Sequence, residues 1–229
     1  YNSILSSQNP QTGMTTYFQP MATGYFKVYS SPYNNFWCCT GSGMENFTKL
    51  GDTMYMHKGN ILYVNMYQSS VLNWSDQNVK IVQNSKIPDG ETSSFTVNGN
   101  GNLDLRFRIP DWNAGVMTIT VNGEKYSYKT VDGYAQVSRS FSNGDVVNIT
   151  IPEEVTAYAL PDVSNSYGFK YGPVVLSAQL GTSDMNQTTT GMSVSIPKDK
   201  IVSSEKITIK NGNGSVSSFM LNINDYLVK

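Results

Sequence analysis

The sequence is poor in charge, in histidine and in cysteine. Its 229 residues include 16 basic and 17 acidic side chains, so 14% of the chain is charged and the formal net charge is −1. Soluble domains average about 25% charged residues. With no basic surplus we expect no nucleic-acid partner, and with no long apolar run we expect no membrane span. His57 is the single histidine, and no Ser-His-Asp triad can be read from the sequence.

Neutral polar residues take the place of charge on the expected surface. Asn, Ser, Thr, Gly and Tyr hydrogen-bond well to neutral partners such as sugars. This composition is also common in secreted bacterial proteins, so we expect an extracellular or cell-surface location, with the cytoplasm as the alternative. The chain begins at Tyr1 without a methionine or a signal peptide, and its end has no finishing strand pattern. We therefore expect both ends to continue in a longer protein.

The two cysteines of the chain, Cys38 and Cys39, are adjacent. A disulfide between two adjacent cysteines would close a strained ring. The pair can therefore neither cross-link distant parts of the fold nor act as a good reversible redox switch. Two interpretations remain open: small buried packing residues, or a zinc site, because thiolates bind zinc well. Zinc takes four ligands, and Glu45 and His57 could join the pair only if a helix folded back on itself. A zinc site here would therefore take ligands from outside residues 1–229.

One helix is predicted, over residues 43–57. Ser42 and Glu45 have the spacing of a capping box at its start. The apolar residues that share one face of this helix are Met44, Phe47, Leu50 and Met54. His57 and Lys58 would lie at its C-terminal end, before Gly59 as a left-handed stop. The cysteine pair would then lie just before the helix N-terminus, where partial positive charge favours a thiolate.

Residues 1–35 have no clear periodicity but many aromatic side chains. Prolines and glycines recur among them, which is typical of a long ordered loop. The aromatic residues of the segment and its continuation are Tyr17, Phe18, Tyr25, Phe26, Tyr29, Tyr33, Phe36 and Trp37. Packing beneath the loop is the favoured interpretation, and stacking on sugar rings is the alternative.

From residue 61 the hydrophobic period becomes two, with turn residues between the runs. Apolar and charged residues alternate through 103–109, which places Asp104 on a wet face. The dipeptide at 122–123 predicts a hairpin turn, the one at 132–133 is a turn signal that opens the next strand, and Glu153-Glu154 predicts a solvated corner. This spacing predicts an antiparallel β-sandwich. Beyond residue 181 the pattern loosens into a linker and short strand-like runs.

Several segments, in order, resemble the glycoside hydrolase family 127 β-L-arabinofuranosidases. The most specific is 36–45, Phe-Trp-Cys-Cys-Thr-Gly-Ser-Gly-Met-Glu. The other segments that carry the resemblance are 24–29, 49–52, 62–65, 108–112, 143–147 and 171–176. The resemblance favours the site interpretation of the cysteine pair over inert packing.

This resemblance implies an (α/α)-barrel catalytic domain followed by β-sandwich domains. It predicts a mainly β chain with residues 1–59 as the end of the barrel, 60–181 as the sandwich, and 182–229 as a linker and part of a further β unit. It implies that Cys38 is the nucleophile and that Cys38 and Cys39 both bind zinc. The remaining zinc ligands and the acid/base glutamate would lie upstream, within the barrel domain of the same parent chain, so we expect the isolated chain to bind zinc poorly and to be inactive.

The expected function is therefore that of a fragment of a retaining glycoside hydrolase acting on arabinose-containing glycans. The alternative is a non-catalytic β-sandwich that binds carbohydrate or serves as a scaffold. Replacing Cys38 in the full-length parent separates the two. The residues that would bind the substrate are not predicted.

Overall fold

The computed structural model describes residues 9, 11–12, 14, 38–162 and 167–178, and five short strands beyond them. The chain divides into two compact units, one formed by residues 50–154 and the other by residues 1–49 with 155–229. The aromatic residues predicted to pack under the N-terminal loop lie outside the described residues. Within the described residues, no helix has the length and the apolar composition needed to cross a bilayer.

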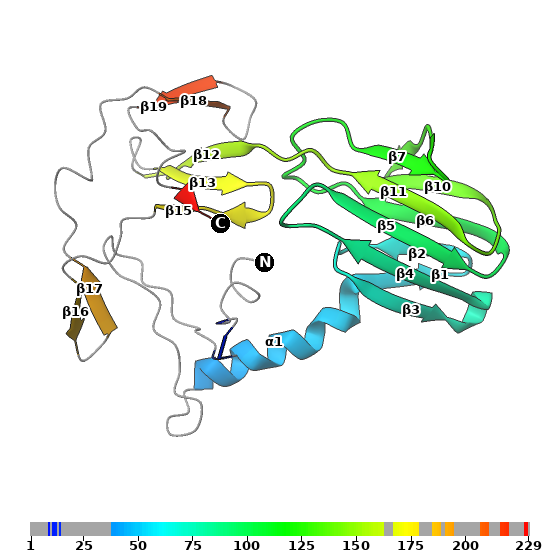
Figure 1. Ribbon diagram of the computed structural model, residues 1–229, viewed down its shortest axis with the longest axis horizontal. Helices are drawn as coiled ribbons and strands as arrows, with labels where there is room; N and C mark the ends of the chain where they lie inside the picture. The colour runs from blue at the N-terminus through cyan, green and yellow to red at the C-terminus, as the bar shows by residue number, and fades with distance from the viewer. Residues whose placement is uncertain are drawn as a thin grey trace. The chain divides into compact units, whose positions relative to one another are not determined.

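Two sheets make up the unit of residues 50–154 (Figure 1). The first has the order β1 (Tyr55–Lys58), β2 (Ile61–Val64), β6 (Gly101–Arg108), β10 (Tyr134–Phe141), β9 (Lys129–Val131). The second has the order β3 (Ser70–Trp74), β4 (Val79–Ser85), β5 (Thr92–Asn98), β11 (Asp145–Thr150), β7 (Thr118–Val121), β8 (Glu124–Lys125). All strand pairs in this unit are antiparallel except β2 with β6. The predicted antiparallel β-sandwich is confirmed.

The core lies between the two sheets. Alternate residues of each central strand point inward, as the two-residue period predicts. In β5 and β6, Phe95 and Phe107 are fully buried, and their ring centroids lie 4.8 Å apart. Tyr67 packs edge-on against Phe95 from the loop after β2, and its hydroxyl donates to the Arg108 carbonyl. Burial of these large apolar side chains supplies the main driving force for the packing of the sheets.

The hairpin turn predicted at 122–123 is present, and the turn signal at 132–133 also forms a two-residue hairpin turn. Asn122 and Gly123, between β7 and β8, have φ of 53° and 85°. Asp132 and Gly133, between β9 and β10, have φ of 50° and 82°. Positive φ at both central residues defines the type I′ turn, whose twist matches that of paired strands. These turns fix the register of the hairpins and therefore which side chains enter the core.

The single described helix, α1, runs from Cys38 to Met54 and so differs from the predicted range 43–57. It begins five residues earlier, and the Ser42–Glu45 pair lies inside it rather than at its start. It also ends earlier, because His57 and Lys58 belong to β1, where they pair with β2. Gly59 has the predicted positive φ of 59°, but in the turn between β1 and β2. Pairing of residues 57–58 with β2 thus outweighs the local preference of these residues for continuing the helix.

The other unit contains small sheets. A three-stranded sheet has the order β12 (Val155–Ala159), β13 (Tyr167–Tyr171), β14 (Val174–Val175). Three strand pairs complete the described part: β15 (Ser177–Ala178) with β20 (Leu227–Val228), β16 (Met185–Thr188) with β17 (Gly191–Val194), and β18 (Ile207–Lys210) with β19 (Val216–Phe219). All of these pairs are antiparallel.

Two predictions about exposed carboxylates are wrong. Asp104 alternates away from the core, as predicted, yet it is only 7% exposed. Its carboxylate accepts from Arg106 Nη2 at 3.1 Å and from Gln136 Nε2 at 2.8 Å. Both bonds go to Oδ2, and Arg106 pairs the charge, whereas the buried Oδ1 has no hydrogen-bond partner among the described residues. Glu153 is also buried, and its backbone N–H donates to Glu91 Oε1 at 2.9 Å, so the residues after β11 are not a solvated corner.

Candidate functional site

The cysteine pair begins the only α-helix among the described residues. Cys38 and Cys39 are the first two residues of α1, whereas the sequence predicted that they would lie just before the helix. The first four N–H groups of a helix have no intrahelical acceptor and carry the positive end of its dipole. In general, a helix N-terminus favours the thiolate form of a cysteine.

The last turn of α1 is fastened to the sandwich by one residue. Asn65, the residue after β2, donates from its backbone N–H to the Met54 carbonyl at 3.0 Å. Its side-chain Nδ2 donates to the Thr53 carbonyl at 2.9 Å, and its Oδ1 accepts from Tyr134 Oη at 2.7 Å. Two carbonyls that the helix end leaves unpaired are thus satisfied, and the helix C-terminus is held to β2 and β10.

The metal ligands that the sequence predicts are Cys38 and Cys39. Within the described residues, no group of three or more His, Cys, Asp or Glu side chains lies together. Glu45 is exposed on α1 and His57 is in β1, so the structure does not bring either into a cluster with other ligands. Two adjacent thiolates suit zinc by chemistry, and zinc takes four ligands. Cys38 and Cys39 therefore fit half of a zinc donor set.

A polar and aromatic cluster covers the outer face of the first sheet. Arg106 lies 5.3 Å from the Tyr63 ring centroid, and its guanidinium donates to Asp104. Tyr63 and Tyr134 meet edge to face, with centroids 5.3 Å apart. The hydrogen bond that Arg106 donates to Asp104 raises the pKa of Arg106 above its ordinary value. The cluster is an ion pair supported by rings and amides, and its members are bound to one another.

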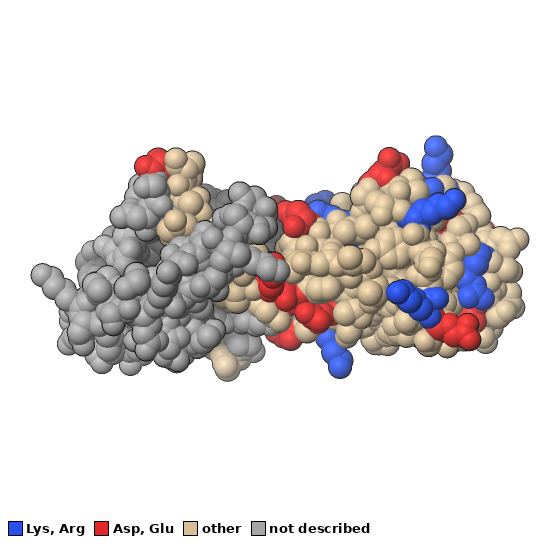
Figure 2. Space-filling model, turned by 90° about the horizontal axis from the view of Figure 1, so that it is seen from above, with Lys and Arg blue, Asp and Glu red and all other residues tan. Residues whose placement is uncertain are grey.

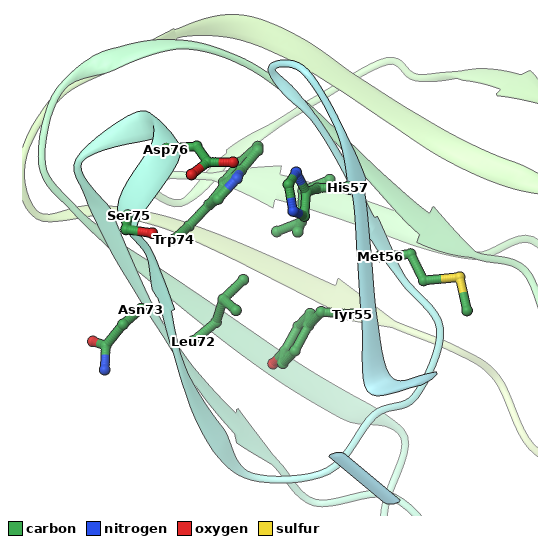
Figure 3. A pocket seen from close by; sticks show the side chains of 9 residues that line it. Tyr55, Met56, His57, Leu72, Asn73, Trp74, Ser75 and Asp76 are labelled. Carbon is green, nitrogen blue, oxygen red and sulfur yellow. The ribbon is translucent and has the colours of Figure 1, made fainter. Parts of the chain in front are cut away.

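A small pocket opens at the edge of the sandwich, between the edge strands β1 and β3 (Figure 3). Its volume is about 130 Å³. The lining residues are Tyr55, Met56, His57, Leu62, Leu72, Asn73, Trp74, Ser75 and Asp76. The last two belong to a 3-10 turn, η2 (Ser75–Gln77), that follows β3. The pocket thus has an apolar base and a polar rim.

Tyr55 ties the two sheets together at this pocket. It comes from β1, and its Oη lies 2.8 Å from Ser70 Oγ of β3 and 2.5 Å from the side-chain amide of Gln83 in β4. Burial raises the pKa of Tyr55 above its ordinary value, and the Ser70 hydrogen bond partly offsets this. A neutral phenol hydrogen-bonded to both neighbours holds β1 and β3 at a fixed separation.

The face that Figure 2 shows carries both signs of charge, and several acidic side chains lie together near the middle of the view. Basic and acidic side chains of both signs are scattered over the sandwich there, with neutral residues between them. Such a surface offers no extended field for a polyanion. It accords with the low charge content of the sequence.

Two family models match the chain, one after the other. Residues 1–52 match the GH127 catalytic domain of β-L-arabinofuranosidases, and residues 61–153 match the GH127 middle domain. The chain belongs to glycoside hydrolase family 127. The cysteine pair and most of α1 fall in the catalytic segment, and the two-sheet sandwich falls in the middle domain.

Solved structures agree with this family. A GH127 β-L-arabinofuranosidase from Geobacillus stearothermophilus T6 is 25% identical, with a TM-score of 0.56 over 66% of this chain and 26% of that chain. A structure named as a glycoside hydrolase is 24% identical, with a TM-score of 0.65 over 82% and 34%. A GH127 β-arabinofuranosidase is 17% identical, with a TM-score of 0.66 over 93% and 39%, and the last two show the fold alone. The chain therefore spans well under half the length of these proteins. Among curated proteins, none gives a significant match.

The sequence located some of these features and missed others. The cysteine pair was found by its motif, and the structure places it at a helix start. The pocket was not foreseen, because β3 reads Ser-Val-Leu-Asn-Trp and lacks a clean alternation. Its residues come from two edge strands of different sheets, and no local pattern joins Tyr55 or His57 to Trp74.

Proposed function

We propose that this chain is the C-terminal part of the catalytic barrel and the following sandwich of a retaining glycoside hydrolase that removes β-L-arabinofuranosyl units. The observation that carries the proposal is the match of residues 1–52 to the family's catalytic domain, with Cys38-Cys39 inside it at the start of α1. Residues 1–59 are assigned to the barrel under this proposal. The substrate class is an arabinose-containing glycan.

Cys38 is the proposed nucleophile. Its sulfur attacks the anomeric carbon, so a carbon–sulfur bond forms as the glycosidic carbon–oxygen bond breaks. The departing oxygen takes a proton from an acid, which lies outside the residues that this chain contributes. Water then gives one proton to the base that the acid has become and attacks the same carbon, so that the carbon–sulfur bond breaks, the sugar leaves with retained configuration and the sulfur returns to its thiolate. The positive end of α1 helps hold that thiolate ready between turnovers.

Cys38 and Cys39 would together hold a zinc ion, with further ligands from upstream of this chain. Bound zinc would keep the sulfur of Cys38 deprotonated at neutral pH. Cys39 would then act by ligation rather than by attack. The two adjacent cysteines thus have separate roles in the proposal. A substitution of Cys38 should therefore lower kcat, and a substitution of Cys39 should lower the zinc content together with activity.

The test uses the full-length parent. Cys38→Ser should lower kcat for an aryl β-L-arabinofuranoside by more than about a thousandfold, and Cys39→Ser should lower the zinc stoichiometry together with activity. Thr48→Ser, an exposed change on the same helix, is the matched control. A slow substrate should leave a sugar adduct on the peptide that contains Cys38, detected by mass spectrometry. Unchanged hydrolysis by Cys38→Ser would refute the nucleophile.

The isolated 229-residue chain should behave differently from the parent. Since two thiolates are half of a zinc donor set, it should bind zinc weakly and should not turn over the same substrate. Zinc analysis after gel filtration and a prolonged hydrolysis assay measure this. Tight stoichiometric zinc or measurable turnover by this chain alone would contradict the proposed division of the site.

A further inference from the structure

The second sheet of the sandwich ends in an edge strand, β3, that carries no charge (Figure 1). The other edge strands of the two sheets each contain a lysine, namely Lys58 in β1, Lys129 in β9 and Lys125 in β8. The stretch 69–75, which includes β3, has no charged residue, no proline and no glycine. Charged side chains, above all lysine, and proline keep edge strands from pairing with other chains. Of the four edges, β3 therefore lacks this protection.

β3 is also the longest and a regular edge. It has five residues, against four in β1, three in β9 and two in β8. Each residue from Ser70 to Trp74 pairs with β4 in unbroken register, so no bulge bends the strand away from a newcomer. Among the described residues, no strand pairs with its outer side. The N–H and C=O groups on that side are a template for one more strand.

The side chains of β3 also suit an added strand. Val71 points to the outer face of the sheet and is 56% exposed. Leu72, the middle residue, is on the inner face but only half-buried, whereas Trp74 on the same face is buried. A strand laid along this edge would cover part of Val71 and complete the burial of Leu72. Removal of this apolar surface from water favours the association.

The charge pattern of the edge fits a second copy of the same chain. Two β3 strands related by a two-fold axis run antiparallel, and each pairs with the other's copy of the same stretch. All five residues find a partner only when Leu72 lies opposite Leu72 of the second copy. Val71 then lies opposite Asn73, and Ser70 opposite Trp74. No charge meets a like charge along the pair, which lysine-bearing edges do not allow.

The basic residue next to this edge is far enough from its own copy. Lys80 lies opposite Asn73, one strand further into the sheet. Strands lie about 4.8 Å apart and residues rise about 3.4 Å along a strand, so the two Lys80 residues of such a pair would be about 16 Å apart. This distance is about twice the Debye length at physiological ionic strength, so salt screens their repulsion.

We propose that β3 pairs with β3 of a second copy of this chain, in the antiparallel register centred on Leu72, and so joins two six-stranded sheets into one. A five-residue strand is about 17 Å long, so the contact belongs to the weak, transient class that buries less than about 1,200 Å². We expect a Kd on the order of 0.3 mM. The residues that carry the proposal belong to the unit of residues 50–154, and none takes part in the cysteine chemistry.

Disulfide cross-linking tests the register directly. In a Cys38→Ser, Cys39→Ser background, Leu72→Cys supplies one thiol, which the pairing places opposite its own copy. Residues directly opposite in an antiparallel pair have Cα atoms about 4.5–5.5 Å apart, a distance that a disulfide spans. Mild oxidation at about 0.5 mM chain, near the expected Kd, should give mainly covalent dimer on a non-reducing gel. Val116→Cys, at a valine that is 76% exposed and lies outside β3, is the matched control and should stay mainly monomeric.

A second pair of thiols keeps the test sound if Leu72→Cys is poorly folded. Val71 and Asn73 are both exposed, so cysteine is tolerated better there than at Leu72. The register places residue 71 of one copy opposite residue 73 of the other. A mixture of the Val71→Cys and Asn73→Cys chains, in the same background, should therefore form mixed dimers faster than either chain forms dimers alone.

Sedimentation velocity measures the equilibrium without a cross-link. The sedimentation coefficient of the full 229-residue chain should rise with concentration up to about 1 mM, as the expected Kd requires. Val71→Lys should raise the Kd at least about tenfold, because the two new charges would lie about 8 Å apart, within about one Debye length. Val116→Lys makes the same change at the control position and should leave the Kd unchanged.

Three results would overturn the proposal. One is a chain that stays monomeric up to about 1 mM. Another is cross-linking of Leu72→Cys, and of the mixed pair, that is no faster than that of Val116→Cys. The last is self-association that Val71→Lys leaves unchanged, which would assign the contact to another surface. Hydrolysis is not measured in any of these experiments, so their failure leaves the nucleophile assignment standing, and unchanged hydrolysis by Cys38→Ser leaves this pairing standing.

Discussion

Asp145 should be the carboxylate on which the sandwich most depends. It is buried at the start of β11, and its Oδ1 accepts from Asn122 Nδ2 at 2.8 Å while its Oδ2 accepts from the Ser142 backbone N–H at 2.9 Å. Arg139 lies 3.8 Å away and is more exposed, so it contributes little. The Ser142 and Asn122 hydrogen bonds, in that order, lower the pKa of Asp145. The carboxylate thus links the β7–β8 turn to the β10–β11 connection.

Replacing Asp145 with alanine removes both bonds. Hydrogen bonds to a charged acceptor contribute about 1.5–3 kcal/mol each. Water replaces part of this loss because Asn122 and Ser142 lie at exposed turns. We therefore expect the free energy of unfolding to fall by about 2 kcal/mol, equivalent to a shift of about 1 M in the urea midpoint. The matched control, Asp111→Ala at an exposed site, should change it by less than about 0.5 kcal/mol.

The pH dependence gives a second test of Asp145. A folded-state pKa below the unfolded value of about 3.9 means that Asp145 stabilises the fold fully above that value and loses this contribution as the pH falls through the folded pKa. The gap between wild type and Asp145→Asn should therefore be constant near neutrality and shrink in acid.

Urea unfolding followed by tryptophan fluorescence, in a Trp37→Phe background, reports on Trp74 and Trp112 in the unit of residues 50–154. Equal midpoints for Asp145→Ala and Asp111→Ala, or a gap that grows in acid, would refute the assignment of Asp145 as a stabilising link.

Two further stability predictions follow from backbone and side-chain geometry. Gly99 has φ of 124°, and a Cβ there would lie 2.8 Å from the Asn78 carbonyl oxygen, so Gly99→Ala should cost more than about 2 kcal/mol. Gly133→Ala, at φ of 82° with open space, should cost about 1 kcal/mol, and equal losses would contradict the clash. Asn65→Ala, which removes two hydrogen bonds, should cost about 1–2 kcal/mol by urea unfolding, whereas the exposed Asn148→Ala should be near neutral.

The sequence by itself determined the mainly β architecture and the Asn122-Gly123 hairpin turn, and it singled out the cysteine pair as the candidate site. These depend on short-range physics, since side-chain alternation sets which face is buried and only a few residue types accept positive φ. The helix was predicted with shifted ends, because pairing of His57 and Lys58 with β2 competes with helix continuation and decides where α1 stops.

Only the tertiary structure decided which polar groups are buried and which are brought together. Asp104 alternates outward but is buried by Arg106 and Gln136, residues that reach it from its own strand and from β10. The pocket needs β1 and β3, the edge strands of different sheets, to lie next to one another at the edge of the sandwich. Such contacts depend on strand order and register, which a one-dimensional pattern does not encode. The cysteine motif was readable because it is contiguous, whereas the Trp74 pocket exists only once the sheets have packed.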